Sequence, residues 1–268
     1  MNLRSRIGAL RRRVWSGFYR REIPLGQHGP FITFTFDDFP RSAFLVGAPL
    51  VERFGGHATF YASLGRIGTK NNLGEQFHKA DLQSLVARGH EVASHTFRHS
   101  SAHKMGYREF EHDVRRGLEA LRDQLGGQAS SNFAYPYGEV TLTAKRGLAR
   151  QLDSCRTTCP GLNGPSVDLN FLYANSLYGG IEKVEFARRL IQQNEASKTW
   201  LIFYTHDVSD DPSPYGCTPE LLEEALSYAT AHGSRLLSIA EVLSEFRSDD
   251  SIGRGDRRIL EQGCGVRS

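Results

Sequence analysis

The sequence predicts an α/β fold with a largely parallel sheet. Short runs of β-branched and aromatic residues alternate with segments of helical composition along most of the 268 residues. About seven strands are expected, and this number suits a closed or nearly closed barrel. No internal repeat and no linker divides the chain, so one large domain is expected.

The first clear strand covers residues 31–36 and reads Phe-Ile-Thr-Phe-Thr-Phe, a run of β-branched and aromatic residues typical of a buried strand. The other strands are expected at 57–61, 90–94, 132–135, 154–158 and 200–205. Residues 235–238 lead into the final helix. The stretches 62–78 and 160–180 are rich in glycine, and we expect loops there.

Helices are expected between these strands, at 43–54, 81–87, 107–125, 141–152, 182–194, 218–233 and 240–246. The helix at 107–125 is clearly amphipathic because its apolar residues recur every three or four positions. The helix at 218–233 begins with a capping threonine, a proline in the first turn and an acid near its positive end (Thr218-Pro219-Glu220).

The overall charge of +3 and the hydrophobic content of 39% are ordinary, and nothing in this balance indicates a nucleic-acid partner. The exception is residues 1–28, whose apolar positions follow helical spacing and whose first 22 residues hold seven arginines. We expect a basic amphipathic helix that docks on the domain or stays solvated. The alternative is peripheral contact with an anionic membrane. The polar tail, residues 248–268, is expected to be disordered.

The four cysteines, Cys155, Cys159, Cys217 and Cys264, are too few and too scattered for a disulfide framework. No stretch reads as a secretory signal or a membrane span. The sequence therefore predicts a cytoplasmic protein, with the inner face of the membrane as an alternative location.

Residues with metal-binding and catalytic chemistry follow several predicted strands. Asp37 and Asp38 come directly after the strand at 31–36, and His95 and His99 come after the strand at 90–94. Active sites of parallel α/β folds lie at the carboxyl ends of the strands. Two histidines and one of the carboxylates can hold a catalytic divalent cation with an open position for water. Zinc is the expected metal, with cobalt, nickel or manganese as alternatives. His103 continues the spacing, but we expect it on the surface.

Two further strand ends add to this set. The stretch Tyr135-Pro136-Tyr137-Gly138 is a turn that can direct a backbone N–H into a site. His206 follows the apolar strand at 200–205 and could supply a proton near neutral pH.

With these residues, the sequence resembles the polysaccharide deacetylase family, also called the NodB homology domain or carbohydrate esterase family 4. Its first motif is matched by residues 35–38, its second by residues 95–99, its third in part by residues 135–138 and its last by His206. The resemblance spans roughly residues 30–247, so the domain is expected to cover residues 29–247.

This resemblance implies a distorted (β/α)7 barrel and metal-dependent removal of acetyl groups from N-acetylated sugars. The motif positions imply the following roles: Asp37 as general base, Asp38, His95 and His99 as metal ligands, His206 as general acid, and the Tyr137 backbone N–H, after Pro136, as oxyanion donor.

The sequence departs from the family pattern in two places. An arginine usually stands two residues before the proline of the third motif, where this chain has Ala134. The fourth motif is not recognisable. We hypothesise that Arg156, on the neighbouring strand, supplies the missing positive charge near Asp37. Asp153 and Asp168 are the candidates for orienting His206.

The sequence therefore predicts an N-deacetylase acting on an N-acetylhexosamine in a carbohydrate, such as a chito-oligosaccharide, a lipid-linked sugar or a glycan precursor. Alternatives are an O-acetyl esterase, a catalytically weakened glycan-binding protein and another amidase on this scaffold. The sugar, its chain length and the oligomeric state stay open.

Overall fold

The computed structural model describes residues 15–25 and 29–248, which form a distorted parallel α/β barrel as the sequence predicts. The sheet runs in the order β10, β11, β2, β3, β6, β7, β8, and neighbouring strands are parallel. The strand bounds are β2 Phe31–Phe36, β3 Thr59–Ala62, β6 Glu91–Ser94, β7 Asn132–Ala134, β8 Ser154–Arg156, β10 Asn175–Ser176 and β11 Trp200–Thr205.

The segment that ends in β10 connects the two edges of this sheet. Leu172 bridges to β8, where its N–H donates to the Cys155 carbonyl at 2.9 Å, and β10 then pairs with β11. The short strand β12 (Arg235–Leu236) pairs with Phe31 and Ile32 of β2. Strand β3 pairs only with Thr35 and Phe36, at the carboxyl end of β2. Strand β12 therefore fills the space beside the amino end of β2.

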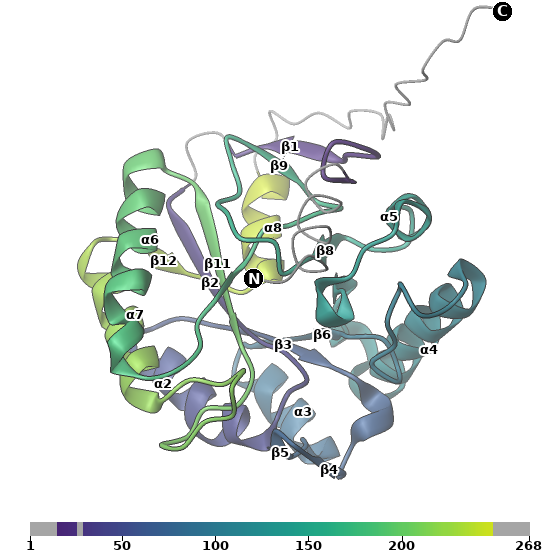
Figure 1. Cartoon of the computed structure of the whole chain (residues 1–268), viewed down its shortest axis with the longest axis horizontal. Coiled ribbons are helices and arrows are strands. Elements are labelled where there is room, and N and C mark those ends of the chain that lie inside the picture. The colour runs from purple at the N-terminus through teal and green to yellow at the C-terminus, as the bar shows by residue number, and fades with distance from the viewer. Residues whose placement is uncertain (1–14, 26–28, 249–268) are drawn as a thin grey trace, which may run out of the picture.

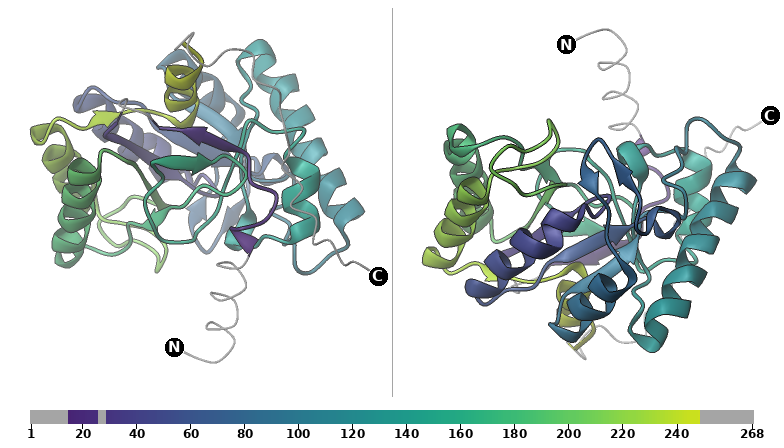
Figure 2. Two further views of the ribbon diagram at one scale, coloured as in Figure 1. Left: turned by 90° about the horizontal axis from the view of Figure 1, so that it is seen from above. Right: turned by 90° about the horizontal axis from the view of Figure 1, so that it is seen from below.

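The helices lie around the outside of the curved sheet (Figure 1; Figure 2). Their bounds are α2 Ala48–Arg53, α3 Lys79–Ala87, α4 Tyr107–Leu125, α5 Leu142–Leu148, α6 Val184–Ser197, α7 Pro219–Ala231 and α8 Ile239–Ser248. Each covers the sheet with an apolar face, and in α4 the buried face includes Phe110, Val114 and Leu121. The predicted cap of α7 is present, because the Thr218 hydroxyl accepts from the Leu221 N–H at 3.2 Å.

The main differences from the predicted elements are short strands inside the expected loops. A hairpin of β4 (Lys70–Asn71) and β5 (Gly74–Glu75) occupies part of 62–78. Strand β9 (Ser166–Asp168) lies in 160–180 and pairs antiparallel with β1 (Glu22–Pro24). These strands of two or three residues show no periodicity of their own, so no local pattern predicted them.

The N-terminal helix prediction falls partly on described residues. Trp15 is helical, and the chain then bends and enters β1 at Glu22, so the expected helix does not reach residue 22. Residues 1–14 and the tail from residue 249 lie outside the described residues, and so does Cys264. Cys155, Cys159 and Cys217 are buried. None of the described helices combines the length and apolar character needed to cross a bilayer.

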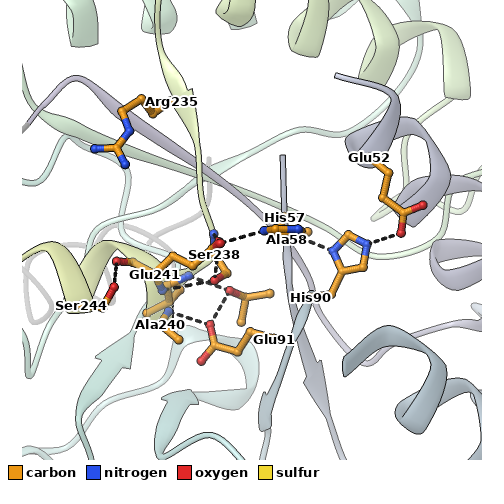
Figure 3. Close-up of polar contacts among 12 residues, drawn as sticks. Glu52, His57, Ala58, His90, Glu91, Arg235, Ser238, Ala240, Glu241 and Ser244 are labelled. Atoms are coloured by element: carbon orange, nitrogen blue, oxygen red, sulfur yellow. Dashed lines mark hydrogen bonds and ion pairs between the residues drawn. The ribbon is translucent and has the colours of Figure 1, made fainter. Parts of the chain in front are cut away.

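A buried polar cluster joins the amino ends of β3, β6 and β7 to α8 (Figure 3). Glu91 is 7% exposed. Its carboxylate accepts from the Thr59 hydroxyl at 2.8 Å, the Ala240 N–H at 2.9 Å, the Asn132 amide at 2.6 Å and the Ser130 hydroxyl at 2.5 Å. These four donors come from three separate parts of the chain, so Glu91 fastens α8 to the sheet.

His90 extends this cluster toward α2 (Figure 3). Its Nδ1 accepts from the Ala58 N–H at 3.0 Å, and its Nε2 lies 2.8 Å from the Glu52 carboxylate. Because Nδ1 is occupied as an acceptor, Nε2 carries the proton. Burial lowers the pKa of His90 despite the opposing effect of Glu52. The folded structure therefore favours the neutral form of the His90 ring.

Replacing Glu91 with alanine should destabilise the fold, because four donors lose their acceptor and those on Thr59 and Asn132 are buried. We expect the free energy of unfolding to fall by roughly 3 kcal/mol or more. Urea denaturation followed by circular dichroism measures this. Glu119→Ala is the matched control: Glu119 is an exposed residue of α4 whose contact with Arg115 is 3.8 Å long. The control should stay within about 0.5 kcal/mol of the parent protein. Equal stability of the two variants would contradict the role of Glu91.

Candidate active site

The carboxyl ends of the strands bring the predicted residues to one end of the barrel. Phe36 of β2 pairs with Thr205 of β11, so Asp37 and His206 follow adjacent strand ends, and the Asp37 N–H donates to the Thr205 carbonyl at 2.8 Å. A cavity of about 660 Å³ opens there. It is lined by Asp37, Asp38, Arg66, Thr69, Asn71, Asn72, Leu73, His95, His99, Tyr137, Thr158, Tyr178, Tyr204, His206 and Tyr215.

Asp38, His95 and His99 form a buried group whose ligand atoms lie within 4.8 Å of one another. The Asp38 Oδ1 atom is 3.0 Å from His99 Nε2 and 4.0 Å from His95 Nε2. His95 Nδ1 donates to the Ala134 carbonyl at 2.8 Å, which leaves Nε2 with a lone pair toward the group. This is the donor set and orientation that a divalent cation requires, so the residues present fit such an ion.

The electrostatics of this group agree with a ligand role. Burial alone would raise the pKa of Asp38, but the contact with His99 and the charges of His99, His95 and Arg66 outweigh burial and hold it well below its usual range. Burial and the neighbouring His99 lower the pKa of His95 to about 3. At neutral pH the site therefore offers an ionised carboxylate and a neutral imidazole, the forms that bind metal.

The backbone around this cavity is strained. Of the seven described residues other than glycine with positive φ, five lie here: Asp38 (58°), Phe39 (50°), Thr96 (61°), His99 (61°) and Tyr137 (61°). A residue with a Cβ costs about 1 kcal/mol in this region. Such strain gathers where the surrounding structure holds side chains for function rather than for stability.

Asp37 pairs with Arg156, which reaches it from the end of β8. The two side chains form a short, buried contact between Arg156 Nη2 and Asp37 Oδ1. The guanidinium lies over the rings of Tyr61 and Tyr204, at 5.0 and 5.3 Å from their centroids. Burial alone would lower the pKa of Arg156, but Asp37 outweighs burial and raises it. The structure thus places a fixed positive charge against Asp37, although the third-motif position is Ala134.

The turn after β7 packs against Asp38, His95 and His99, which together are called the metal-type group below. Pro136 is buried, whereas the Tyr137 side chain is 57% exposed and its ring lies 4.6 Å, centroid to centroid, from that of His99. Gly138 is required, because a Cβ there would lie 1.9 Å from the Thr158 hydroxyl. Tyr137 and Gly138 both have positive φ, of 61° and 63°.

His206 is held by the loop that follows it. Its Nδ1 donates to the Tyr215 carbonyl at 3.0 Å, since a carbonyl can only accept. The buried Asp207 carboxylate shapes this loop by accepting from the Ser213 N–H at 2.7 Å and from the Ser213 hydroxyl at 2.5 Å. Gly216 is needed beside it, because a Cβ would lie 2.5 Å from Asp207 Cγ.

Asp153 and Asp168 do not orient His206, and this correction follows from their places in the fold. Asp153 precedes β8, at the amino end of the barrel, where it lines a different cavity. The Asp168 carboxylate pairs with Lys145 Nζ at 2.7 Å and accepts from the Arg21 N–H at 3.0 Å. The backbone carbonyl of Tyr215 accepts the hydrogen bond from His206 Nδ1 that we expected a carboxylate to accept.

Several residues of the cavity were missed by the sequence analysis. Tyr178, Tyr204 and Tyr215 form a tyrosine wall next to His206, with ring centroids 5.5 Å (Tyr178–Tyr204) and 6.1 Å (Tyr178–Tyr215) apart. Arg66 lies 3.1 Å from Asp38 Oδ1. Asp207, which lies outside the cavity lining, was also missed, although its place directly after His206 is visible in the sequence. His103 stays outside the metal-type group and contacts the Val140 carbonyl at 3.0 Å.

Comparison with known proteins finds a family model, a curated relative and solved structures that this chain resembles. Residues 26–153 match the model of the family described as polysaccharide deacetylase. A chitooligosaccharide deacetylase from Sinorhizobium fredii is 30% identical over 140 residues. That alignment covers 49% of this chain and 60% of the relative, so the chain matches less than two thirds of that protein's length.

Two solved structures show the same fold. The Xyl-CE4 domain of a multidomain xylanase from the hindgut metagenome of Trinervitermes trinervoides has a TM-score of 0.51 and 21% identity, and the match covers 81% of this chain and 91% of that chain. The peptidoglycan deacetylase PdaC from Bacillus subtilis has a TM-score of 0.52 and 14% identity, with 84% and 95% covered.

Fold and site together define a deacetylase-type α/β barrel with a metal-type group at the carboxyl ends of its strands. Residues 26–153, just under half of the chain, match the polysaccharide deacetylase family, and the two solved structures above share the fold of this chain.

Replacing His99 with alanine should remove one of the three ligand atoms. We expect the parent protein to bind one zinc ion and the variant to bind it at least about 100-fold more weakly, because loss of a ligand should exceed the 10- to 100-fold effect of losing a ligand's supporting hydrogen bond. Calorimetric titration of the metal-free protein measures this. His103→Ala is the matched control, because it removes a nearby histidine outside the group. Unchanged zinc affinity in His99→Ala would contradict the assignment.

Proposed function

We propose that this protein is a metal-dependent N-deacetylase that acts on an N-acetylhexosamine unit of a glycan or glycan precursor. The observation that carries the proposal is the buried Asp38–His95–His99 group beside Asp37, in a cavity that His206 also lines. A divalent cation bound there would polarise the acetamide carbonyl and increase the acidity of a water molecule. Zinc is the metal that we favour for this mixed nitrogen and oxygen donor set.

Asp37 is proposed as the general base. It follows the same strand end as the ligand Asp38, and Arg156 fixes its carboxylate through Oδ1. A base held in one orientation at the cavity wall can take a proton from the attacking water without first losing rotational freedom. The Tyr137 backbone N–H is the proposed donor to the tetrahedral oxyanion.

His206 is proposed as the general acid. Because Nδ1 donates to the Tyr215 carbonyl, the ring exchanges protons with the substrate through Nε2. The carbonyl also stabilises the imidazolium, whose Nε2 proton can pass to the departing amine. Expulsion of an amine requires this proton, so the position of His206 in the cavity supports amide cleavage.

The walls of the cavity support a carbohydrate substrate. The tyrosine wall offers ring faces on which the apolar face of a sugar can pack. Thr69, Asn71 and Asn72, from the segment that forms the β4–β5 hairpin, offer polar groups that can pair with hydroxyls. The cytoplasmic location and the membrane contact of residues 1–28 remain predictions.

The first experiment measures acetate release from N-acetylglucosamine oligomers, with and without added zinc. We expect zinc-dependent release by the parent protein and a loss of about 100-fold or more in Asp37→Asn, which is isosteric but cannot accept the proton. Zinc binding by the variant confirms that its site is intact. Release from O-acetylated xylan alone would favour the esterase alternative. If the zinc-loaded protein releases no acetate from either substrate, the proposal is refuted.

Arg156 is proposed to act through Asp37. We expect Arg156→Ala to lower kcat by about 100-fold with little change in KM, because a misplaced base costs about that much. The test of this route is a double-mutant comparison: in an Asp37→Asn background, Arg156→Ala should cause no further loss. Thermal unfolding and zinc titration accompany it, since an unpaired buried carboxylate destabilises a protein by roughly 3–5 kcal/mol. Unchanged turnover in a folded Arg156→Ala protein would refute the role.

A further inference from the structure

We propose that the cavity prefers an N-acetylhexosamine with an anionic group on a carbon next to the one that carries the acetamide, and that Arg66 binds this anion. The inference rests on the proposed function, because it assumes that the acetamide reaches the Asp38–His95–His99 group. It adds to that function a class of substrate and the residue that selects it.

Arg66 is held in place by the backbone of the loop that carries His95 and His99. It ends a short 3₁₀ turn, Leu64–Arg66, in which the Gly65 N–H donates to the Phe97 carbonyl at 2.8 Å. A Cβ on Gly65 would lie 2.8 Å from the same carbonyl, so this approach requires glycine. On its other side, the Arg66 carbonyl accepts from the Thr69 hydroxyl at 2.8 Å. The turn therefore has a fixed position relative to His95 and His99.

The Arg66 guanidinium lines the cavity rather than the outer surface. Its side chain is 27% exposed, and Nη1 lies 3.1 Å from Asp38 Oδ1. Among the described residues, Asp38 is the only carboxylate in an ion pair with it. A guanidinium has five N–H donors in a planar fork, so one carboxylate oxygen leaves donors for a second anion.

The charges around the cavity favour an anionic substrate. Asp37 is neutralised by Arg156 and Asp38 by Arg66, so these four residues carry no net charge. Histidines that bind a metal are neutral, and a divalent cation would therefore leave the group with a charge of +2. Asp37 and Asp38 are the only carboxylates among the residues that line the cavity. An anion on the substrate would meet unopposed positive charge there.

The position of the anion follows from the contact between Arg66 and Asp38. The acetamide must lie at the Asp38 group, and Arg66 is a direct neighbour of that carboxylate. An anion that pairs with Arg66 must therefore lie close to the acetamide, which points to a substituent on an adjacent ring carbon. In a 2-acetamido sugar these are carbon 1, as in a glycosyl phosphate, and carbon 3, as in a carboxyalkyl ether. Both present the oxygen anion that a guanidinium binds.

Binding to the zinc-loaded Asp37→Asn protein tests the inference without turnover. The probes are N-acetylglucosamine, N-acetylglucosamine 1-phosphate and N-acetylmuramic acid, compared by calorimetry. We expect at least one anionic sugar to bind about tenfold or more tightly than the neutral sugar, as a charge-assisted hydrogen bond can supply. A preference for the phosphate identifies carbon 1 as the anionic position, and a preference for the lactyl ether identifies carbon 3.

Arg66→Gln in the same background should abolish this difference, which is measured within the variant as the ratio of its affinities for the anionic and the neutral sugar. Arg115→Gln is the control, because it removes one positive charge from an exposed site on α4, and it should keep the difference. A preference that survives Arg66→Gln would show that the metal alone attracts the anion, and this would overturn the inference. Zinc titration of the Arg66 variant shows that its site is folded.

The two proposals fail in different ways. Acetate release from neutral oligomers, combined with equal binding of neutral and anionic sugars, would refute the role of Arg66 and keep the deacetylase. An Arg66-dependent preference for anionic sugars, combined with no acetate release from any probe, would refute the deacetylase and keep an anion-selective sugar site.

Discussion

The rest of the site depends on the buried ion pair between Arg156 and Asp37. These residues are 119 positions apart, and their contact ties the end of β8 to the end of β2 across the barrel. Burying either charge alone would cost several kcal/mol, so each residue is tolerated only in the presence of the other. The rings of Tyr61 and Tyr204 contact the guanidinium and complete its surroundings. Such a pair fixes the orientation of the Asp37 carboxylate, which is the proposed general base.

The opposite ends of the barrel have opposite physical characters. At the amino ends, Glu91 accepts hydrogen bonds from four donors and stabilises the fold. At the carboxyl ends, positive φ values gather, and Asp38 Oδ1 and His99 Nδ1 are buried without a well-directed hydrogen bond. Polar atoms of this kind cost free energy unless a ligand completes them. This division lets the first end compensate for strain at the second.

Local sequence was sufficient for the elements whose apolar pattern is long enough to read. The strands β2 and β11 have the predicted bounds, 31–36 and 200–205, and α4 covers the predicted 107–125. The hairpin β4–β5 and the β1–β9 pair were not predicted, because strands this short depend on their partners rather than on their own residues. The same stretches supply cavity residues such as Asn71, so the missed elements affected the site as well.

The sequence alone determined which chemical groups follow which strands: Asp37 and Asp38 after β2, His95 after β6 and His206 after β11. Parallel strands end at one edge of a sheet, so these residues had to lie near one another. Only the tertiary structure decided their partners. Arg66 and the Tyr215 carbonyl reach the site from segments that the sequence analysis did not connect with it, and the barrel brings the hypothesised Arg156 to Asp37. Asp168 forms an ion pair with Lys145 and not the predicted contact with His206. Long-range pairs depend on how the strands close into a barrel, and no local pattern of residues records that closure.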